Sequence, residues 1–262
     1  MSYIWEIKAK DVSMQIIALI NQKGGVGKTT CAINIGAGLN NLNKRVLLID
    51  LDPQAHLTYS LGIPAHELKN TVYELLKGKA DLKETIVKRN GLSLVPSSLN
   101  LSGAEIEFSG LAGREFLLKE SIEGFKEFDY LFIDCPPSLG LLTLNALTTT
   151  QEVYIPLQTE FLALQGMKKL LETIDIVKKR LNKYLEITGI IATRFDSRKN
   201  LNREVVEKIK EYFGNKLFNT LIRDNVSLAE APSFGKSIFE YKFNSFGAKD
   251  YLSLCKEIIK RG

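Results

Sequence analysis

Short apolar runs alternate with longer stretches of helical periodicity along most of the 262-residue chain. Two of the runs, at 16–20 and 46–49, have the composition of buried parallel strands, and residues 29–42 between them suit a helix. Further strand-like runs lie at 92–96, 130–133, 153–156, 187–192 and 217–222, and the clearest further helical stretches lie at 162–181, 203–213 and 248–260. This alternation predicts an α/β fold with a single doubly wound, mostly parallel sheet flanked by helices.

The same pattern suggests the domain boundaries. Residues 14–262 show no internal repeat or long linker, and their number suits one domain with a full core. Residues 1–13 mix Trp5 with charged residues and lack the apolar centre of a signal peptide, so we expect a short N-terminal extension. Translation from Met1 and from Met14 both fit this pattern. No apolar run approaches the ~20 residues of a membrane-spanning helix, so no membrane partner is expected.

Composition changes the picture only slightly. The 35 Lys and Arg residues exceed the 30 Asp and Glu residues, which gives a net charge of +5. Such a balance is compatible with a polyanionic partner but does not require one. Cys31, Cys135 and Cys255 lie far apart without a metal-binding spacing, so we expect free thiols in a reducing cytoplasm.

A glycine-rich segment follows the first predicted strand and opens the first predicted helix. Residues 23–30 read Lys-Gly-Gly-Val-Gly-Lys-Thr-Thr. Small residues let backbone N–H groups fold around the phosphates of a nucleotide, and the helix dipole strengthens that attraction. Lys28 is expected to reach the phosphates, and the Thr29 hydroxyl to bind Mg²⁺. The common form of this motif has glycine at the position of Gln22, and here a second lysine, Lys23, begins the loop.

Acidic residues follow two other predicted strands at the same end of the sheet. Asp50 and Asp52 come after the run at 46–49, and alternation along an extended strand places both on one side. Asp134 follows the run at 130–133, as does the carboxylate that holds a magnesium-bound water in phosphate-transferring enzymes. A single aspartate at a strand end is as often a turn or cap residue, so the prediction depends on the combination.

Together these segments resemble the deviant Walker A ATPases of the ParA/MinD group, and most of all the ParA/Soj ATPases that segregate bacterial DNA. The resemblance covers about residues 14–260. The segments that carry it are 23–30, 47–54, 138–147, 155–158, 193–198 and 230–236. It implies a P-loop NTPase fold, identifies 14–262 as a single ParA-type ATPase domain, and implies ATP and Mg²⁺ as cofactors.

The resemblance also assigns roles at the phosphates. It implies that Lys23 reaches across a dimer to the partner's nucleotide, where a second cation stabilises the charge of the transition state. It further implies that Asp52 orients the attacking water, which makes Lys23 and Asp52 the catalytic residues. The implied metal site consists of Thr29, Asp50 and Asp134.

The rest of the implied nucleotide site lies near the end of the chain. Arg223 and Asn225 occupy the stretch that borders the base, although Arg223 replaces the family's usual proline. The complete set expected to bind the nucleotide is Lys23, Gly24, Gly25, Val26, Gly27, Lys28, Thr29, Thr30, Arg223 and Asn225.

The implied function is a slow, dimerisation-dependent ATP hydrolase that partitions chromosomes or plasmids. The resemblance implies a homodimer in the ATP-bound state, non-specific binding to double-stranded DNA, a ParB-type centromere-binding partner and a cytoplasmic, nucleoid-associated location. Arg198 matches a DNA-contacting arginine of Soj-like proteins, whereas Ser227, Asn244 and Phe246 stand where others are expected. The residues expected to bind DNA are Arg198, Lys199, Arg203, Lys236 and Lys242.

Two other classes of protein use the same scaffold. A MinD-like or other cargo-positioning ATPase would act on a surface other than DNA, but residues 251–262 resemble a last core helix with no basic amphipathic helix appended. An iron–sulfur reductase would need two cysteines from each subunit, and Cys135 has no obvious companion.

Overall fold

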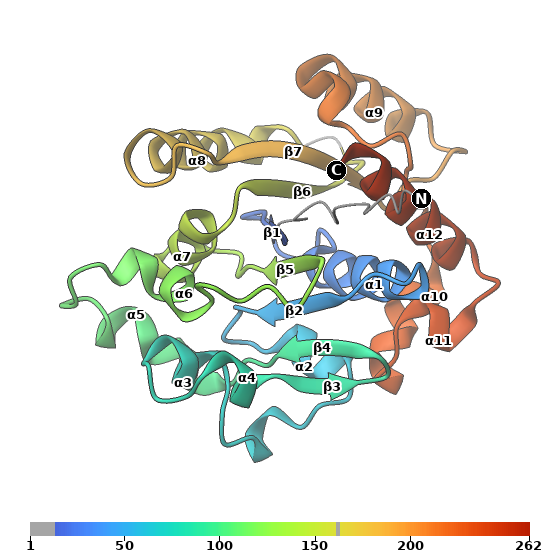
Figure 1. The fold of residues 1–262 in the computed structure, drawn as a ribbon. Helices are drawn as coiled ribbons and strands as arrows, with labels where there is room; N and C mark the ends of the chain where they lie inside the picture. The colour runs from blue at the N-terminus through green and yellow to red at the C-terminus, as the bar shows by residue number, and fades with distance from the viewer. Residues whose placement is uncertain (1–13, 161–162) are drawn as a thin grey trace, which may run out of the picture.

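The computed structural model describes residues 14–160 and 163–262, so the N-terminal extension expected at 1–13 lies outside the described residues. A seven-stranded sheet has the order β3-β4-β2-β5-β1-β6-β7 (Figure 1). The strands are β1 (Gln15–Leu19), β2 (Val46–Asp50), β3 (Val87–Arg89), β4 (Leu92–Val95), β5 (Tyr130–Asp134), β6 (Glu152–Gln158) and β7 (Glu186–Thr193). Every neighbouring pair is parallel except β3–β4.

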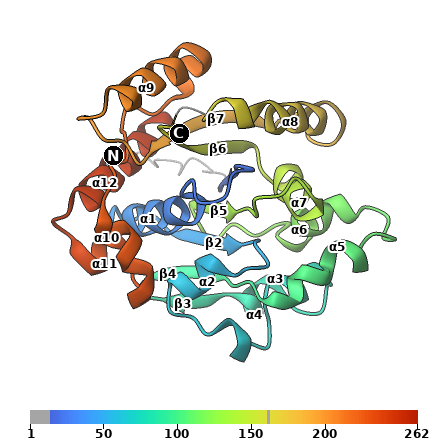
Figure 2. The same cartoon turned by 180° about the vertical axis from the view of Figure 1, so that it is seen from behind.

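Helices cover both faces of this sheet (Figures 1 and 2). Their bounds are α1 (Lys28–Asn41), α2 (His56–Ser60), α3 (Val72–Leu76), α4 (Leu82–Thr85), α5 (Ala104–Glu107), α6 (Leu117–Ser121), α7 (Leu141–Thr149), α8 (Lys168–Arg180), α9 (Asn200–Phe213), α10 (Val226–Glu230), α11 (Ile238–Lys242) and α12 (Phe246–Arg261). No helix among the described residues is long and apolar enough to cross a membrane.

The two faces of the sheet carry separate apolar cores. Alternate residues of the central strands point to opposite faces, so Ile17 packs with α1 and α12 while Ala18 packs with α7 and α8. Every residue of β2 and of β5 is buried. Strands buried on both faces have continuous apolar runs, which is why these segments show no alternation of polar residues.

The register of the central strands brings the predicted site residues together. Leu19 at the end of β1 pairs with Asp134 at the end of β5, and Asp134 pairs in turn with Asp50 at the end of β2. Since all three strands are parallel, the loops that follow them leave the sheet at one edge. Ligands of doubly wound sheets bind at this edge.

The structure confirms the predicted fold class but corrects one strand. Residues 217–222, predicted as a strand, form an isolated bridge between Leu217 and Ile190 instead, and the N–H groups of Phe218 and Ile222 donate to carbonyls of β7. Between these two contacts with β7, the N–H groups of Asn219 and Thr220 donate to the Glu257 carboxylate of α12, at 2.8 and 3.1 Å. The Glu257 carboxylate therefore interrupts the ladder of backbone hydrogen bonds to β7.

Smaller differences concern the ends of elements. The helix predicted at 162–181 begins at Lys168, after a short 3₁₀ turn, and residues 161–162 lie outside the described part. The helix predicted to start at 203 already begins at Asn200. Strand β3 was not predicted, because three residues with two exposed charges give no apolar pattern.

Gly189 gives a test of how tightly side chains pack around β7, the outermost strand on one side of the sheet. A Cβ at this position would lie 2.5 Å from Phe218 and 2.6 Å from Tyr154, two buried rings that meet edge to face. Overpacking of this kind costs about 1–3 kcal/mol, so we expect Gly189→Ala to lower the free energy of unfolding by that amount in urea titrations. Gly110→Ala is the control, since a Cβ there meets nothing within 4 Å. Equal unfolding midpoints for the two variants would contradict this packing.

Candidate nucleotide-binding site

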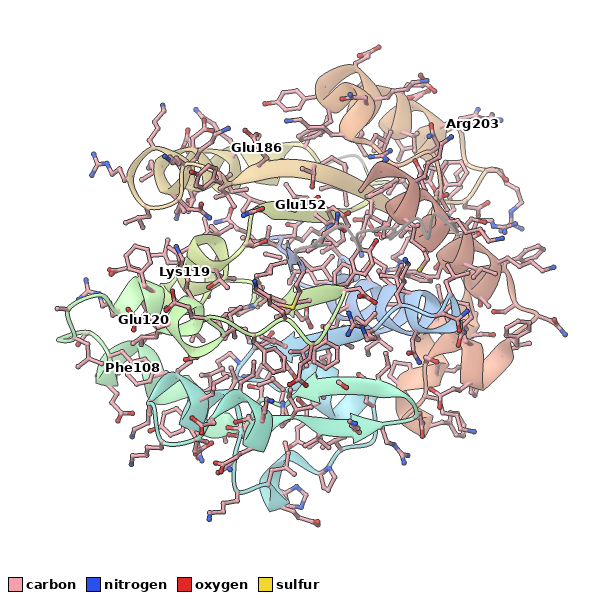
Figure 3. All side chains as sticks on the ribbon, in the orientation of Figure 1. Phe108, Lys119, Glu120, Glu152, Glu186 and Arg203 are labelled. Atoms are coloured by element: carbon pink, nitrogen blue, oxygen red, sulfur yellow. The ribbon has the colours of Figure 1, made fainter. Side chains whose placement is uncertain are left out.

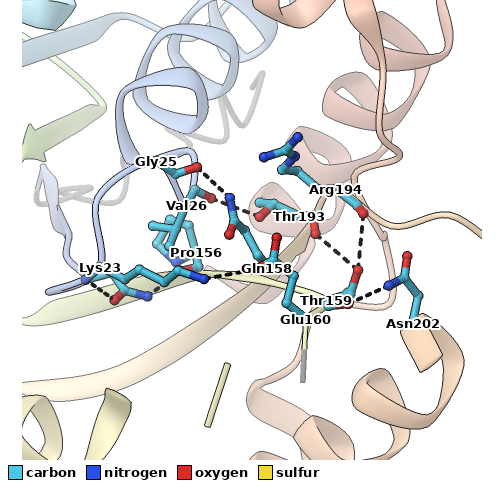
Figure 4. Close-up of polar contacts among 11 residues, drawn as sticks. Lys23, Gly25, Val26, Pro156, Gln158, Thr159, Glu160, Thr193, Arg194 and Asn202 are labelled. Atoms are coloured by element: carbon cyan, nitrogen blue, oxygen red, sulfur yellow. Dashed lines mark hydrogen bonds and ion pairs between the residues drawn. The ribbon is translucent and has the colours of Figure 1, made fainter. Parts of the chain in front are cut away.

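The glycine-rich loop between β1 and α1 is held in shape by the protein itself. Gly25 and Gly27 have φ angles of 73° and 97°, in the left-handed region that favours glycine. The last residues of β6 and β7 form hydrogen bonds with the loop. The Gln158 amide donates to the Gly25 carbonyl at 2.7 Å, and the Thr193 hydroxyl donates to the Val26 carbonyl at 2.9 Å (Figure 4). A Cβ added at Gly24 or Gly25 would meet nothing within 4 Å, so the space before the loop is open.

The two lysines of the loop have different surroundings. Lys28, the first residue of α1, is 8% exposed, and its ammonium group donates to the Asn21 carbonyl at 3.1 Å. An ammonium group has three donors, so two remain for a bound anion. Lys23 lies at the surface and forms an ion pair with Glu160 at 2.8 Å. Only Lys28 is therefore placed at the base of the loop.

Thr29 and Asp134 meet beneath the loop. The Thr29 hydroxyl donates to Oδ2 of Asp134 at 2.6 Å, while Oδ1 of Asp134 is buried without a hydrogen-bond partner among the described residues. Burial, and after it the nearby Asp50 carboxylate, raises the pKa of Asp134 to about 8. A buried oxygen without a partner is costly, and a hydroxyl beside a carboxylate suits the oxygen ligands that Mg²⁺ prefers. These residues fit a magnesium ion or one of its bound waters.

The carboxylates of Asp50 and Asp52 differ in how many hydrogen bonds they accept from the protein. Asp50 accepts from the N–H and hydroxyl of Thr58, at 2.9 and 2.7 Å, and from the Asp52 N–H at 3.2 Å. Burial raises the pKa of Asp50 to about 7, against the opposing effect of the Thr58 hydrogen bonds. Asp52 is 9% exposed and accepts from the Gln54 N–H at 2.9 Å. Asp50 thus fixes the loop on which Asp52 is carried.

A cavity of about 270 Å³ opens beside the glycine-rich loop. Arg223 and Asn225 line it, as do Thr193 and Arg194, which no sequence motif predicted as site residues. The Arg223 guanidinium is bound by the Asp250 carboxylate and lies 4.2 Å from the Phe246 ring centroid. The side-chain oxygen of Asn225 accepts from the Ser227 N–H at 2.9 Å and caps α10. Both predicted residues border the cavity with their side chains already bound.

A larger groove of about 1030 Å³ lies at the other end of the sheet. Its lining includes Glu152 and Glu186, the first residues of β6 and β7 (Figure 3). It is remote from the glycine-rich loop and from the aspartates at the strand ends. The chemistry of the loop, rather than the size of the cavity, identifies the candidate site.

The residues expected to bind DNA lie in two groups. Arg198, Lys199 and Arg203 lie at the start of α9, while Lys236 and Lys242 lie before and at the end of α11. Helix α12 lies between α9 and α11 (Figures 1 and 2).

Within the first group, the Arg198 charge already has a partner. The Arg198 guanidinium is bound by both oxygens of Asp196 at 2.9 Å, and this pairing lowers the pKa of Asp196 to about 2. Among the departures from the expected arginines, Ser227 is buried and Phe246 is exposed. The five cations expected to bind DNA thus come from two separate parts of the chain, 198–203 and 236–242.

The strand order, the Lys-Thr pair at the start of α1 and the aspartate at the end of β5 define a P-loop nucleotide-binding protein. A family model described as an AAA domain matches residues 14–187. Sporulation initiation inhibitor protein Soj of Bacillus subtilis (strain 168) is 47% identical over 253 residues, which are 95% of this chain and 99% of that protein. Chromosome partitioning protein ParA of Myxococcus xanthus (strain DK1622) is 45% identical over 94% of this chain and 88% of its own. The chain belongs to the Soj/ParA family of chromosome-partitioning proteins.

A solved structure agrees with this assignment of the fold. Cobyrinic acid a,c-diamide synthase from Mycobacterium smegmatis, solved with a bound ATP analogue and magnesium, superimposes with a TM-score of 0.83. It is 36% identical and the match covers 95% of both chains. The predicted fold class and the predicted family are thus both confirmed.

The buried carboxylate of Asp134 predicts how stability depends on pH without nucleotide. Because its folded-state pKa is raised from 3.8 to about 8, the folded protein binds more protons than the unfolded chain between these values, and the free energy of unfolding falls as pH rises through this range. Asp134→Asn removes that effect. We expect the variant to gain stability over the wild type from pH 5 to pH 8, by a few kcal/mol at pH 8, in urea titrations with EDTA.

Asp129→Asn is a control of opposite sign. Arg45 lowers the pKa of Asp129, so this carboxylate stabilises the fold above its ordinary pKa and loses that effect as pH falls. Its replacement should therefore reduce stability at pH 8. An Asp134→Asn variant that loses stability at pH 8 would show that this buried charge is compensated in the free protein.

Proposed function

We propose that this chain is a slow ATP hydrolase that partitions chromosomes or plasmids as a dimerising switch. The proposal includes non-specific binding of double-stranded DNA by the ATP-bound homodimer, at the nucleoid, and stimulation by a ParB-type centromere-binding partner. The observation that carries it is the open phosphate loop above the Thr29–Asp134 pair, with one Asp134 oxygen left for a further partner. The chromosome partitioning named for the relative in Myxococcus supports the same function.

The loop and its surroundings would bind ATP with Mg²⁺. The loop N–H groups and Lys28 contact the β- and γ-phosphates, and the 270 Å³ cavity receives the nucleoside. Among the described residues no group of three or more His, Cys, Asp or Glu side chains is arranged to hold a metal alone. Magnesium commonly uses one or two protein ligands together with phosphate oxygens and water. Thr29 and Asp134 would hold the ion, which neutralises phosphate charge, and Asp50 supports the loop beside them.

Hydrolysis would need two further groups. Asp52, at the edge of the site, orients the attacking water. The Lys23 ammonium group lies at the surface beside Glu160, and in a dimer it would exchange this partner for the nucleotide of the second copy. A cation supplied in this way stabilises transition-state charge and makes hydrolysis depend on dimerisation.

Two substitutions separate binding from hydrolysis. Lys28→Ala removes the buried cation from the phosphates, so ATP affinity should fall by about 30-fold or more, in line with the ~2–5 kcal/mol cost of truncating a buried charge pair. Asp52→Ala should bind ATP normally, hydrolyse it about 100-fold more slowly or worse, and accumulate as a dimer in light scattering. Lys126→Ala, an exposed lysine elsewhere, is the control. Affinity within a few-fold of wild type in Lys28→Ala would exclude residues 23–30 as the phosphate loop.

At the proposed DNA surface, a carboxylate of the protein itself binds one of the cations that would contact DNA. The Asp196 carboxylate binds Nε and Nη2 of the Arg198 guanidinium, so its negative charge competes with a DNA phosphate for this cation. Binding should therefore be weak, and each cation that contacts phosphate should contribute about one unit to the slope of log affinity against log salt.

This competition can be measured with the hydrolysis-deficient Asp52→Ala protein. Added Arg198→Glu should weaken binding to all duplex sequences and lower the salt slope, whereas Asp196→Asn should strengthen binding. Lys119→Glu is the control, because Lys119 on α6 and Arg203 on α9 lie on opposite sides of the molecule (Figure 3). An ATP-bound dimer without DNA affinity at low salt would favour the alternative function, a MinD-like or other cargo-positioning ATPase that acts on another surface.

The iron–sulfur alternative has less support. Cys31, Cys135 and Cys255 are all buried, and none has an accessible sulfur at a surface that two subunits could share. Burial also raises the pKa of each thiol, which disfavours the thiolate that binds iron.

A further inference from the structure

An ion pair connects the phosphate loop to the segment that follows β6. Nζ of Lys23 lies 2.8 Å from Oε2 of Glu160 (Figure 4), and the two side chains are 49% and 51% exposed. Lys23 is the lysine that distinguishes this loop from the common motif. Its ammonium group is thus held by its own chain, at the surface.

Two other contacts join the loop to the same strand end, and they are of a different kind. The Asn21 amide donates to the Pro156 carbonyl at 2.8 Å, and the Gln158 amide donates to the Gly25 carbonyl at 2.7 Å. Asn21 and Gln158 are each 5% exposed. Breaking a buried hydrogen bond leaves unsatisfied polar groups, whereas an exposed ion pair favours one geometry by no more than about fivefold. Lys23 can therefore leave Glu160 while the loop keeps its shape.

We propose that Glu160 is a positioning residue, which retains Lys23 on its own chain until the nucleotide of a second copy competes for the ammonium group. This inference rests on the dimerising function proposed above. Triphosphate oxygens carry more negative charge than one carboxylate, so the exchange favours the dimer only when nucleotide is bound. Glu160 restrains dimerisation in the meantime.

The surroundings of Glu160 suit such an exchange. Its pKa is lowered first by the Lys23 hydrogen bond, and Arg194 and Lys199 lower it further. These two cations remain nearby after Lys23 leaves, so the Glu160 carboxylate is not left as an isolated charge. A dimer requires two such ion pairs to open, which weakens dimerisation by up to about 25-fold, the product of two fivefold factors.

The test compares dimerisation with and without the Glu160 charge. In the Asp52→Ala protein with saturating ATP and Mg²⁺, added Glu160→Gln should lower the dimer dissociation constant about 2- to 25-fold by sedimentation velocity. The difference should shrink at high salt, which screens exposed charges. Glu160→Asp should restore the parent value, since Lys23 is flexible enough to reach a shorter carboxylate. An unchanged or raised dissociation constant for Glu160→Gln overturns the inference.

A matched control and a second readout complete the design. Glu204→Gln on α9 removes an exposed carboxylate that lines the same small cavity as Glu160, and it should leave the dissociation constant unchanged. If the Asp52→Ala parent fails to dimerise with ATP, the proposed function fails and the restraint on dimerisation fails with it. Acetylation of Lys23 in the monomer then tests separately whether Glu160 retains this lysine. Glu160→Gln should speed that acetylation about twofold or more relative to Lys126, because the ion pair protects the amine. Equal rates would overturn the ion pair's role.

Discussion

The parallel pairing of β1, β5 and β2 is the constraint on which the site depends. It sets Leu19, Asp134 and Asp50 side by side in the sheet. The phosphate loop after β1 and the loop after β2 that carries Asp52 therefore leave the sheet at the same edge, where Asp134 also lies. Parallel strands need crossover helices, and α1 is the crossover from β1 to β2. The helix that completes the fold therefore also presents its N-terminus, with Lys28 and Thr29, to the site. A shift of one residue in this register would turn Asp134 to the other face.

That arrangement places two carboxylates in a buried site. Asp50 and Asp134 are 0% and 1% exposed, and burial raises the pKa of both. Thr58 and the Asp52 N–H satisfy Asp50, while one Asp134 oxygen has no partner among the described residues. Charge of this kind costs stability in the empty protein. A cation and a nucleotide would offset the cost, so binding and stability are linked.

Much of this was visible in the sequence because it depends on local pattern. Continuous apolar runs marked the central strands, and residues 23–30 marked the loop through its glycines. The features that the sequence did not predict have a common physical cause, namely contacts between residues distant in sequence. Residues 217–222 are apolar enough for a strand, but Glu257, 37 or 38 residues away, accepts from the N–H groups of Thr220 and Asn219. Likewise no local pattern reveals that Asp250 holds Arg223 or that Glu160 holds Lys23.

The contrast between Lys28 and Lys23 shows how one loop can hold one lysine in a fixed position and another in an exchangeable contact. Lys28 is buried against Asn21, and the backbone around it is bound by Gln158 and Thr193. These contacts are costly to break, so the phosphate cradle persists in the empty protein. Lys23 is held only by an exposed ion pair, whose small free energy allows ready exchange. A residue that must act on a second molecule has to be easily released, and a residue that must bind first has to be fixed in advance. The difference in burial between Lys23 and Lys28 meets both requirements within six residues of sequence.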